Sequence, residues 1–194
     1  WDHCGPLQDL VRQNQVVLVT GETGCGKSTQ VPQFLLDDPV TGPEGSIICT
    51  QPRRLSAISI ADRVAHERGE SVGGMVGYAV RGDTSCSDAT QLSFVTPGLL
   101  LRRLASDPEL RQYTHVVIDE VHEQDKYSEF LLIVLKDLLP RRPDLRLVLM
   151  SATLQASKFS DFFGGCPMTK IGSSMYPVDT YFLEDVLRQT SFLI

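Results

Sequence analysis

Apolar and polar positions alternate along the chain in blocks that predict strands and helices in turn. Short runs rich in β-branched residues predict strands over residues 16–20, 46–50, 91–95, 116–119 and 147–150. Stretches with helical periodicity predict helices over 27–37, 55–69, 97–106, 127–139 and 156–163. Turn-forming residues predict loops at 37–45 and 81–88. This alternation indicates an α/β fold with a mostly parallel sheet and helices on both faces.

Length and charge narrow the classes of protein that fit this pattern. The 194 residues, 42% of them hydrophobic, suffice for one domain with a core, and no linker divides them. The net charge of −6 excludes a surface that is basic throughout, so a nucleic-acid site has to be local. No secretory signal and no apolar run of about 18 residues is present, so we expect no membrane partner.

The cysteines indicate a reducing compartment. An odd number, widely spread and without a C-x-x-C pair, argues against both a disulfide framework and a zinc site. We therefore expect an intracellular location, cytoplasmic or nuclear. The chain begins with Trp1 instead of methionine, which suggests a piece of a larger protein. The five cysteines are Cys4, Cys25, Cys49, Cys86 and Cys166.

The stretch GETGCGKST, residues 21–29, is the first candidate site. It follows a predicted strand and opens a predicted helix, which is the context that the G-x-x-x-x-G-K-[ST] phosphate loop requires. We expect its three glycines to take backbone conformations that other residues avoid, so that main-chain N–H groups turn towards phosphates. The predicted nucleotide-binding residues of the loop are Gly21, Glu22, Thr23, Gly24, Cys25, Gly26, Lys27, Ser28 and Thr29.

Three side chains of the loop have separate predicted roles. Lys27 would neutralise the β- and γ-phosphates of ATP, Ser28 would bind Mg²⁺, and Thr29 would contact the α-phosphate. The alternative is an ordinary glycine-rich turn that carries a surface lysine.

The segment THVVIDEVHE, residues 114–123, is the second candidate site. A buried-strand pattern runs into Asp119 and Glu120, the arrangement of a Walker B motif, and the end of this strand would lie beside the phosphate loop. Asp119 is expected to hold Mg²⁺, and Glu120 to join the metal site and to orient and deprotonate the attacking water. The alternative is that the two carboxylates cap helix 127–139. His122 is interpreted as a hydrogen-bonded positioning residue and not as a metal ligand.

Several motifs together resemble the first RecA-like domain of the superfamily 2 helicases of the DEAH/RNA helicase A group. The resemblance spans essentially the whole chain. DEVH, TPG (96–98) and Gln124 differ from the commonest DEAH pattern and favour the broader DExH subgroup. The motifs, in order, are GETGCGKST (21–29), TQPRRLSA (50–57), VGYAVR (76–81), DEVH (119–122), SAT (151–153) and YPVDTYFLEDVL (176–187).

This resemblance implies a division of roles along the chain. Residues 1–180 would form a RecA-like P-loop domain, and residues 181–194 would begin the connection to a second RecA-like domain. Lys27, Asp119 and Glu120 would carry the ATP chemistry. The resemblance further implies that Arg53, Arg54 and Thr96 line a track for single-stranded RNA, with DNA not excluded, that Arg63 stacks on the nucleotide base, and that His122, Ser151 and Thr153 couple hydrolysis to movement.

Local chemistry supports part of these roles. Arg53 and Arg54 lie where a predicted strand gives way to a helix, which suits contacts from guanidinium groups and helix N–H groups to phosphates. The alternatives are that both are ordinary surface charges and that Ser151 and Thr153 cap the next helix. The basic pairs 102–103 and 141–142 are interpreted as solvated helix ends.

These observations favour the ATP-binding half of an ATP-dependent RNA helicase, with ATP and Mg²⁺ as cofactors and a possible protein activator. Two other functions stay open. One is a catalytically degenerate scaffold that binds RNA or protein. The other is a P-loop kinase or metabolic NTPase, which would need a lid with substrate-binding arginines.

Overall fold

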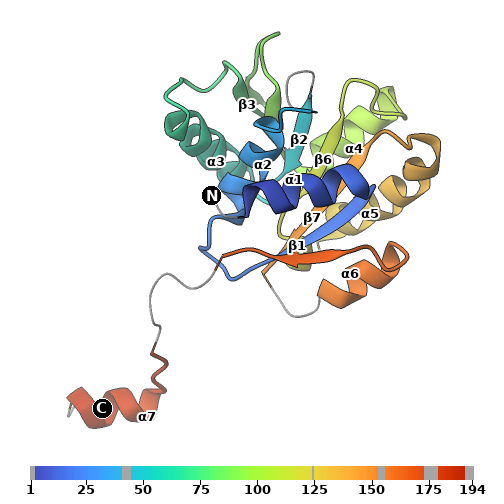
Figure 1. The fold of residues 1–194 in the computed structure, drawn as a ribbon. Helices are drawn as coiled ribbons and strands as arrows, with labels where there is room; N and C mark the ends of the chain where they lie inside the picture. Colours follow the sequence, from blue (N-terminus) through green and yellow to red (C-terminus); the bar gives the residue numbers. More distant parts are fainter. Residues whose placement is uncertain (1–2, 41–44, 124, 153–155, 173–178, 191–194) are drawn as a thin grey trace.

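The computed structural model describes residues 3–40, 45–123, 125–152, 156–172 and 179–190. Within these residues eight strands form one sheet in the order β4-β3-β5-β2-β6-β7-β1-β8 (Figure 1). All neighbouring strands are parallel except β3 and β4. The predicted mostly parallel α/β fold is therefore confirmed. The strands are β1 (Val16–Thr20), β2 (Ile47–Thr50), β3 (Val76–Val80), β4 (Asp83–Ser85), β5 (Leu92–Val95), β6 (His115–Ile118), β7 (Arg146–Ser151) and β8 (Met168–Lys170).

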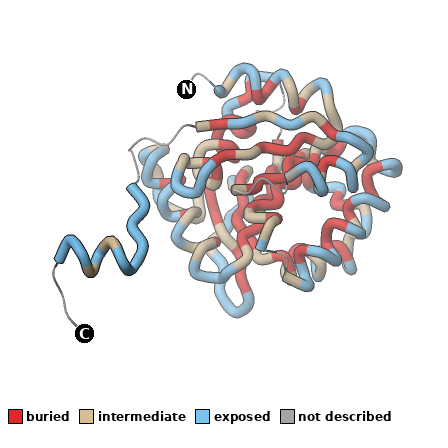
Figure 2. The backbone as a smooth tube through the Cα atoms, turned by 90° about the horizontal axis from the view of Figure 1, so that it is seen from below, coloured by how far each residue is buried: buried red, intermediate tan, exposed pale blue. Residues whose placement is uncertain are grey.

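Helices cover both faces of the sheet. α1 (Cys4–Gln13), α2 (Lys27–Leu36) and α3 (Arg54–Glu67) pack on one face. α4 (Pro97–Ser106), α5 (Lys126–Leu138) and α6 (Ala156–Phe162) lie on the other. α7 (Leu183–Thr190) has no buried residue and stands apart from the other elements in Figures 1 and 2.

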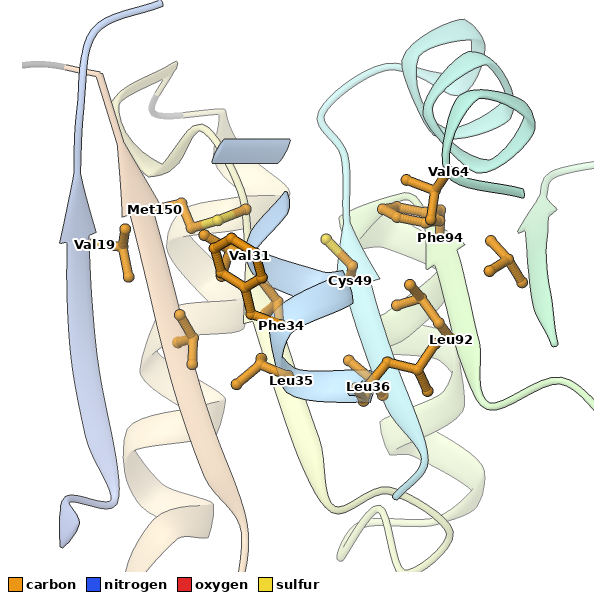
Figure 3. Close-up of a cluster of buried hydrophobic side chains, with 14 of the residues drawn as sticks. Val19, Val31, Phe34, Leu35, Leu36, Cys49, Val64, Leu92, Phe94 and Met150 are labelled. Carbon is orange, nitrogen blue, oxygen red and sulfur yellow. The ribbon is translucent and has the colours of Figure 1, made fainter. Parts of the chain in front are cut away.

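The central strands are buried on both faces because helices cover each one (Figure 2). On β1, Val17 and Val19 point into the cluster beneath α1, α2 and α3, whereas Leu18 points into the cluster beneath α4 and α5. Figure 3 shows Phe34 of α2 lying over the sheet in the first of these clusters, beside Met150. The strands consequently read as continuous apolar runs, which is the pattern that predicted them.

All five predicted strands and all five predicted helices are confirmed, with ends that differ by at most two residues. α1, α7, β3, β4 and β8 were not predicted. The loop prediction over 81–88 is wrong at β4, which pairs antiparallel with β3 through the register Tyr78↔Ser85. Gly82 has a φ of 81° in the turn between them, a value that suits a tight hairpin.

Two of the four arginines interpreted as solvated are packed against the protein. The Arg142 side chain is 11% exposed, and it donates to Asp144 and to the main-chain carbonyls of Glu109 and Tyr113. Arg103 hydrogen-bonds the hydroxyl of Tyr113 and lies over its ring. For these two residues the interpretation is wrong, because each hydrogen-bonds residues of the segment 109–113, which precedes β6.

The described residues contain no helix with both the length and the apolar character needed to cross a bilayer.

Candidate nucleotide and nucleic-acid site

The candidate residues gather along one end of the sheet, at the carboxyl ends of the parallel strands. An α/β sheet of this type binds ligands beyond the carboxyl ends of its strands. The sheet order places the nucleic-acid candidates along one half of this row of strand ends and the nucleotide candidates along the other half. In sheet order the segments are Thr96 after β5, residues 51–54 after β2, Asp119 to His122 after β6, Ser151 at the end of β7, and residues 21–28 after β1.

The glycines of the phosphate loop are required for two different reasons. Gly24 and Gly26 have φ values of 82° and 90°, which side chains disfavour, as predicted. Gly21 is not among the residues with positive φ, so the prediction is wrong there. A Cβ on Gly21 would lie 2.5 Å from the carbonyl oxygen of Ile171, so only glycine fits beside the chain that follows β8.

Lys27, the first residue of α2, is buried within the loop. The residue is only 3% exposed, although its side chain ends in a charged ammonium group. The Nζ donates to the carbonyl oxygens of Gly21 at 2.7 Å and Glu22 at 2.9 Å. The alternative of an ordinary surface lysine is therefore excluded, because the loop folds around the ammonium group.

The other loop residues surround the start of α2. The Thr29 hydroxyl donates to the carbonyl of Gly26 at 3.1 Å. Cys25 packs beside Gly172, because a Cβ added to Gly172 would lie only 2.7 Å from the Cβ of Cys25. Glu22 and Thr23 are exposed. The N–H groups of Thr29 and Gln30 donate to the carbonyl of Gly26 at 3.2 and 2.8 Å. The N–H groups that precede them at a helix N-terminus have no acceptor within the helix, which leaves donors suited to an anion.

Asp119 is almost fully buried and its carboxylate is held from two sides. Oδ2 accepts from the side-chain amide of Gln51 at 2.7 Å, and Oδ1 accepts from the main-chain N–H of Glu120 at 2.9 Å. Burial raises the pKa of Asp119, while interactions with Ser28, Gln51 and Lys27 act in the opposite direction. Ser28 of the phosphate loop and Asp119 therefore share one small polar space.

Glu120 has an unusual backbone and an unsatisfied side chain. Its φ of 51° is rare for a residue with a side chain, and such strain is typical of functional sites. Oε2 is buried and receives no hydrogen bond of acceptable geometry among the described residues, although His122 Nδ1 lies 3.3 Å away. Burial and the neighbouring Asp119 raise the pKa of Glu120. The acidic pair does not cap α5, because Asp125 does so by accepting from the N–H groups of Tyr127 and Ser128.

His122 connects the acidic pair to the end of β7. Besides its proximity to Glu120, its Nδ1 accepts from the N–H of Ala152 at 3.5 Å. Ser151 is fully buried, and its carbonyl accepts from the N–H of Gly21 at 3.3 Å. Residues 119–122, 151–152 and the phosphate loop are thus linked. Thr153 lies outside the described residues, so its predicted role and the capping alternative are untested.

Arg63 lies on α3, close to the helix that follows the phosphate loop. Its Nε donates to Glu67 at 2.6 Å, and the side chains of Gln30 and Gln33 on α2 donate to the same carboxylate. Burial alone would raise the pKa of Glu67, but the hydrogen bonds from Arg63 and the two glutamines lower it overall. The Arg63 side chain remains two-thirds exposed beside α2.

The nucleic-acid candidates lie at two neighbouring helix N-termini. Arg53 occupies the N-cap position of α3 and Thr96 that of α4. The preceding strands β2 and β5 are adjacent, with Thr50 opposite Val95. The Arg53 side chain is 75% exposed and forms a long ion pair of 3.8 Å with Glu123. Arg54 is also exposed. Both guanidinium groups are therefore accessible to a phosphate backbone.

Sequence reasoning missed Gln51 as a member of the site. It stands between β2 and the arginine pair, and its partner Asp119 is 68 residues away. A polar side chain directly after a buried strand was the available signal.

A phosphate loop between a strand and a helix, with a buried lysine and a nearby Asp-Glu pair, defines a P-loop nucleoside-triphosphate-binding domain. Residues 7–162 match the DEAD/DEAH box helicase family. The chain belongs to this family, and its sheet and helices are those of a RecA-like helicase domain.

Three relatives extend the comparison. The chain is 50% identical to a Homo sapiens protein named "Putative ATP-dependent RNA helicase DHX57", over all of this chain and 14% of that protein. It is 54% identical to the "DExH-box ATP-dependent RNA helicase DExH1" of Arabidopsis thaliana, over 95% of this chain and 19% of the relative. It is 47% identical to the "ATP-dependent DNA/RNA helicase DHX36" of Bos taurus, over 96% and 19%. The chain thus spans less than a fifth of the length of each.

Proposed function

We propose that this chain is the ATP-binding half of the motor of an ATP-dependent RNA helicase. Residues 1–180 would form the first RecA-like domain, and residues 181–194 would begin the connection to a second one. The relatives named above, at about 50% identity, carry ATP-dependent RNA helicase in their names, which supports this activity. The observation that carries the proposal is the convergence of Lys27, Ser28 and Asp119 at the ends of β1 and β6.

The phosphate loop would bind ATP through its main-chain N–H groups and the ammonium of Lys27. Residues 21–29 would surround the phosphates, with Thr29 nearest the α-phosphate. Ser28 and Asp119 would hold Mg²⁺, an ion that takes one or two protein oxygens together with phosphate oxygens and water. When bound, Mg²⁺ supplies positive charge that stabilises the transferring phosphoryl group.

Glu120 would position and deprotonate the attacking water. Its buried Oε2 has no hydrogen-bond donor of acceptable geometry among the described residues, so it is available to accept a proton from water. The raised pKa brings this carboxyl closer to the range in which it exchanges protons near neutral pH. Glu120 would also complete the oxygen ligands around the metal site.

Single-stranded RNA would cross the carboxyl ends of β2 and β5, against Arg53, Arg54 and Thr96. These groups contact phosphates and would not distinguish base sequences. DNA is not excluded, and one relative is named a DNA/RNA helicase. Arg63 would leave Glu67 to stack on the nucleotide base.

His122, Ser151 and Thr153 would couple hydrolysis to movement of the second domain. The contact between His122 and Ala152 supports this role, since it joins the acidic pair to the segment that ends β7. A protein activator would act on the complete motor. An intracellular location, cytoplasmic or nuclear, is supported by the five cysteines, all of which are free thiols.

Duplex unwinding by the full-length protein tests the proposal. A labelled RNA duplex with a single-stranded overhang should separate with ATP and Mg²⁺, but not with a non-hydrolysable ATP analogue. The Lys27→Ala protein should not unwind it, and a DNA duplex of the same sequence measures nucleic-acid preference. A protein that binds nucleotide and RNA but never hydrolyses ATP would instead be the degenerate scaffold.

A further inference from the structure

Gln51 joins the two halves of the site through a buried side-chain contact. The residue is 2% exposed, and its Nε2 donates to Asp119 Oδ2 at 2.7 Å. Asp119 is itself 3% exposed. A hydrogen bond from a neutral amide to a carboxylate that water does not reach is among the stronger side-chain bonds in a protein.

The backbone of the same residue ties it to the neighbouring strands. The N–H of Gln51 donates to the carbonyl of Val95 at 2.8 Å, directly before Thr96. The N–H of Asp119 donates to the carbonyl of Thr50 at 3.3 Å. Gln51 therefore lies where β5, β2 and β6 end side by side, and Arg53 follows it by two residues.

The geometry determines what the amide does for Asp119. Glu120 N–H fixes Oδ1 and Gln51 fixes Oδ2, so the carboxylate has a defined orientation. Because the amide is uncharged, it orients the carboxylate without cancelling its negative charge. Loss of the amide leaves Oδ2 with one donor fewer and the carboxylate freer to rotate.

We propose that Gln51 is a positioning residue that couples nucleic-acid binding at Arg53 to the orientation of the Asp119 carboxylate. A phosphate drawn to Arg53 pulls on the turn at 51–54, and the buried hydrogen bond carries that displacement to Asp119. The inference rests on the proposed function, in which Asp119 holds Mg²⁺ beside the nucleotide.

A second connection between the two halves is much weaker. Arg53 and Glu123 lie 3.8 Å apart and are both partly exposed. Exposed pairs of this kind contribute little and are screened by salt. Coupling that depends on Gln51 should therefore persist at high salt better than coupling that depends on this ion pair.

Equilibrium binding to the full-length protein tests the inference without any turnover. The affinity for a non-hydrolysable ATP analogue with Mg²⁺ is measured with and without single-stranded RNA, and the RNA affinity with and without the analogue. Linkage requires the two ratios to be equal, and coupling of this kind is typically about 5–150-fold. In Gln51→Met both ratios should fall together to within about twofold of one, while RNA affinity without nucleotide stays within about twofold of wild type.

Two further variants control this experiment. Gln51→Leu removes the donor without placing a second carboxyl group against Asp119, so it should lose coupling as Gln51→Met does and keeps the test available if the methionine variant fails to fold. Gln8→Met is the matched control. Gln8 is a similarly buried glutamine whose Nε2 donates to the carbonyl of Phe34 at 2.6 Å, away from the site. Its coupling should equal that of wild type.

The possible failures are distinguishable. A wild-type protein that binds no nucleotide would refute the proposed function and this inference with it. A wild-type protein that binds both ligands without mutual influence would refute the inference alone. Wild-type coupling in a folded Gln51→Met or Gln51→Leu protein would do the same.

Discussion

The ammonium of Lys27 and the carbonyl oxygen of Gly21 lie 2.7 Å apart, so the lysine closes the phosphate loop on itself. Phosphate oxygens that enter the loop would replace the carbonyl oxygens of Gly21 and Glu22 as acceptors for the Lys27 ammonium. Charge-assisted hydrogen bonds contribute about 1.5–3 kcal/mol.

Lys27→Ala should therefore weaken binding of a fluorescent ATP analogue by about 10–150-fold. The melting temperature without nucleotide should stay close to that of wild type, since removal of the hydrogen bonds is offset by removal of a buried charge. Lys136→Ala, on the exposed face of α5, is the control. Equal affinities in all three proteins would remove Lys27 from the site.

Glu120→Gln should separate binding from turnover. Glutamine keeps the size of the side chain but cannot accept a proton from water, so the full-length protein should bind ATP normally and hydrolyse it about 10²–10⁴-fold more slowly. Phosphate release under saturating ATP measures the effect, and Glu129→Gln on the surface of α5 should behave as wild type. Hydrolysis at the parent rate by Glu120→Gln would show that the base lies elsewhere.

His115 should make the stability of the chain depend on pH. Burial, and to a lesser extent the charge of Arg146, lowers its pKa from 6.5 to about 4. The unfolded chain binds the proton more readily, so stability is complete above pH 6.5 and falls as the pH drops towards 4. Between pH 7.5 and 5 this residue should cost about 2 kcal/mol of unfolding free energy.

Urea unfolding of wild type and His115→Gln at the two pH values isolates that contribution. The variant should lose about 2 kcal/mol less than wild type between them. His66→Gln, at an exposed position, should follow wild type. A pH dependence that His115→Gln leaves intact would show that the histidine is not the group responsible.

Arg141 and Arg142 form a matched pair in the sequence but not in the structure. Arg142 donates to Asp144 and to two main-chain carbonyls. Arg141 is half exposed, and its ion pair with Asp137 is long, at 3.6 Å. Arg142→Ala should lower the unfolding free energy by about 1.5–3 kcal/mol, and Arg141→Ala by less than about 0.5 kcal/mol. Similar losses in chemical denaturation would contradict this distinction.

The parts of the fold and site that were predictable are those encoded by neighbouring residues. The phosphate loop, with Lys27 as the first residue of α2, is one continuous stretch of sequence. The strands that helices cover on both faces are recognisable as continuous apolar runs. β4 has no such run, because it lies at the sheet edge and its residues are largely polar and exposed. β8 has three residues at the opposite edge, too few for a pattern to emerge.

Contacts between distant segments account for most of what the sequence did not reveal. Gly21 is constrained by Ile171, which lies 150 residues further along the chain. The partner of Gln51 lies after a different strand, and the carbonyl partners of Arg142 precede β6. The positive φ of Glu120 depends on the packing around it and not on its own preference.

Phosphate release tests the central claim most directly, with the 194-residue chain and the full-length protein compared in the same salt. If the chain is half of a two-domain motor, it should bind ATP with Mg²⁺ but hydrolyse it at a trace rate that poly-uridine does not increase. An arginine finger supplied by a second domain typically contributes about 10³–10⁵ in rate. The full-length protein should hydrolyse ATP faster, and RNA should stimulate it further. RNA-stimulated turnover by the 194-residue chain near the full-length rate would contradict the two-domain account.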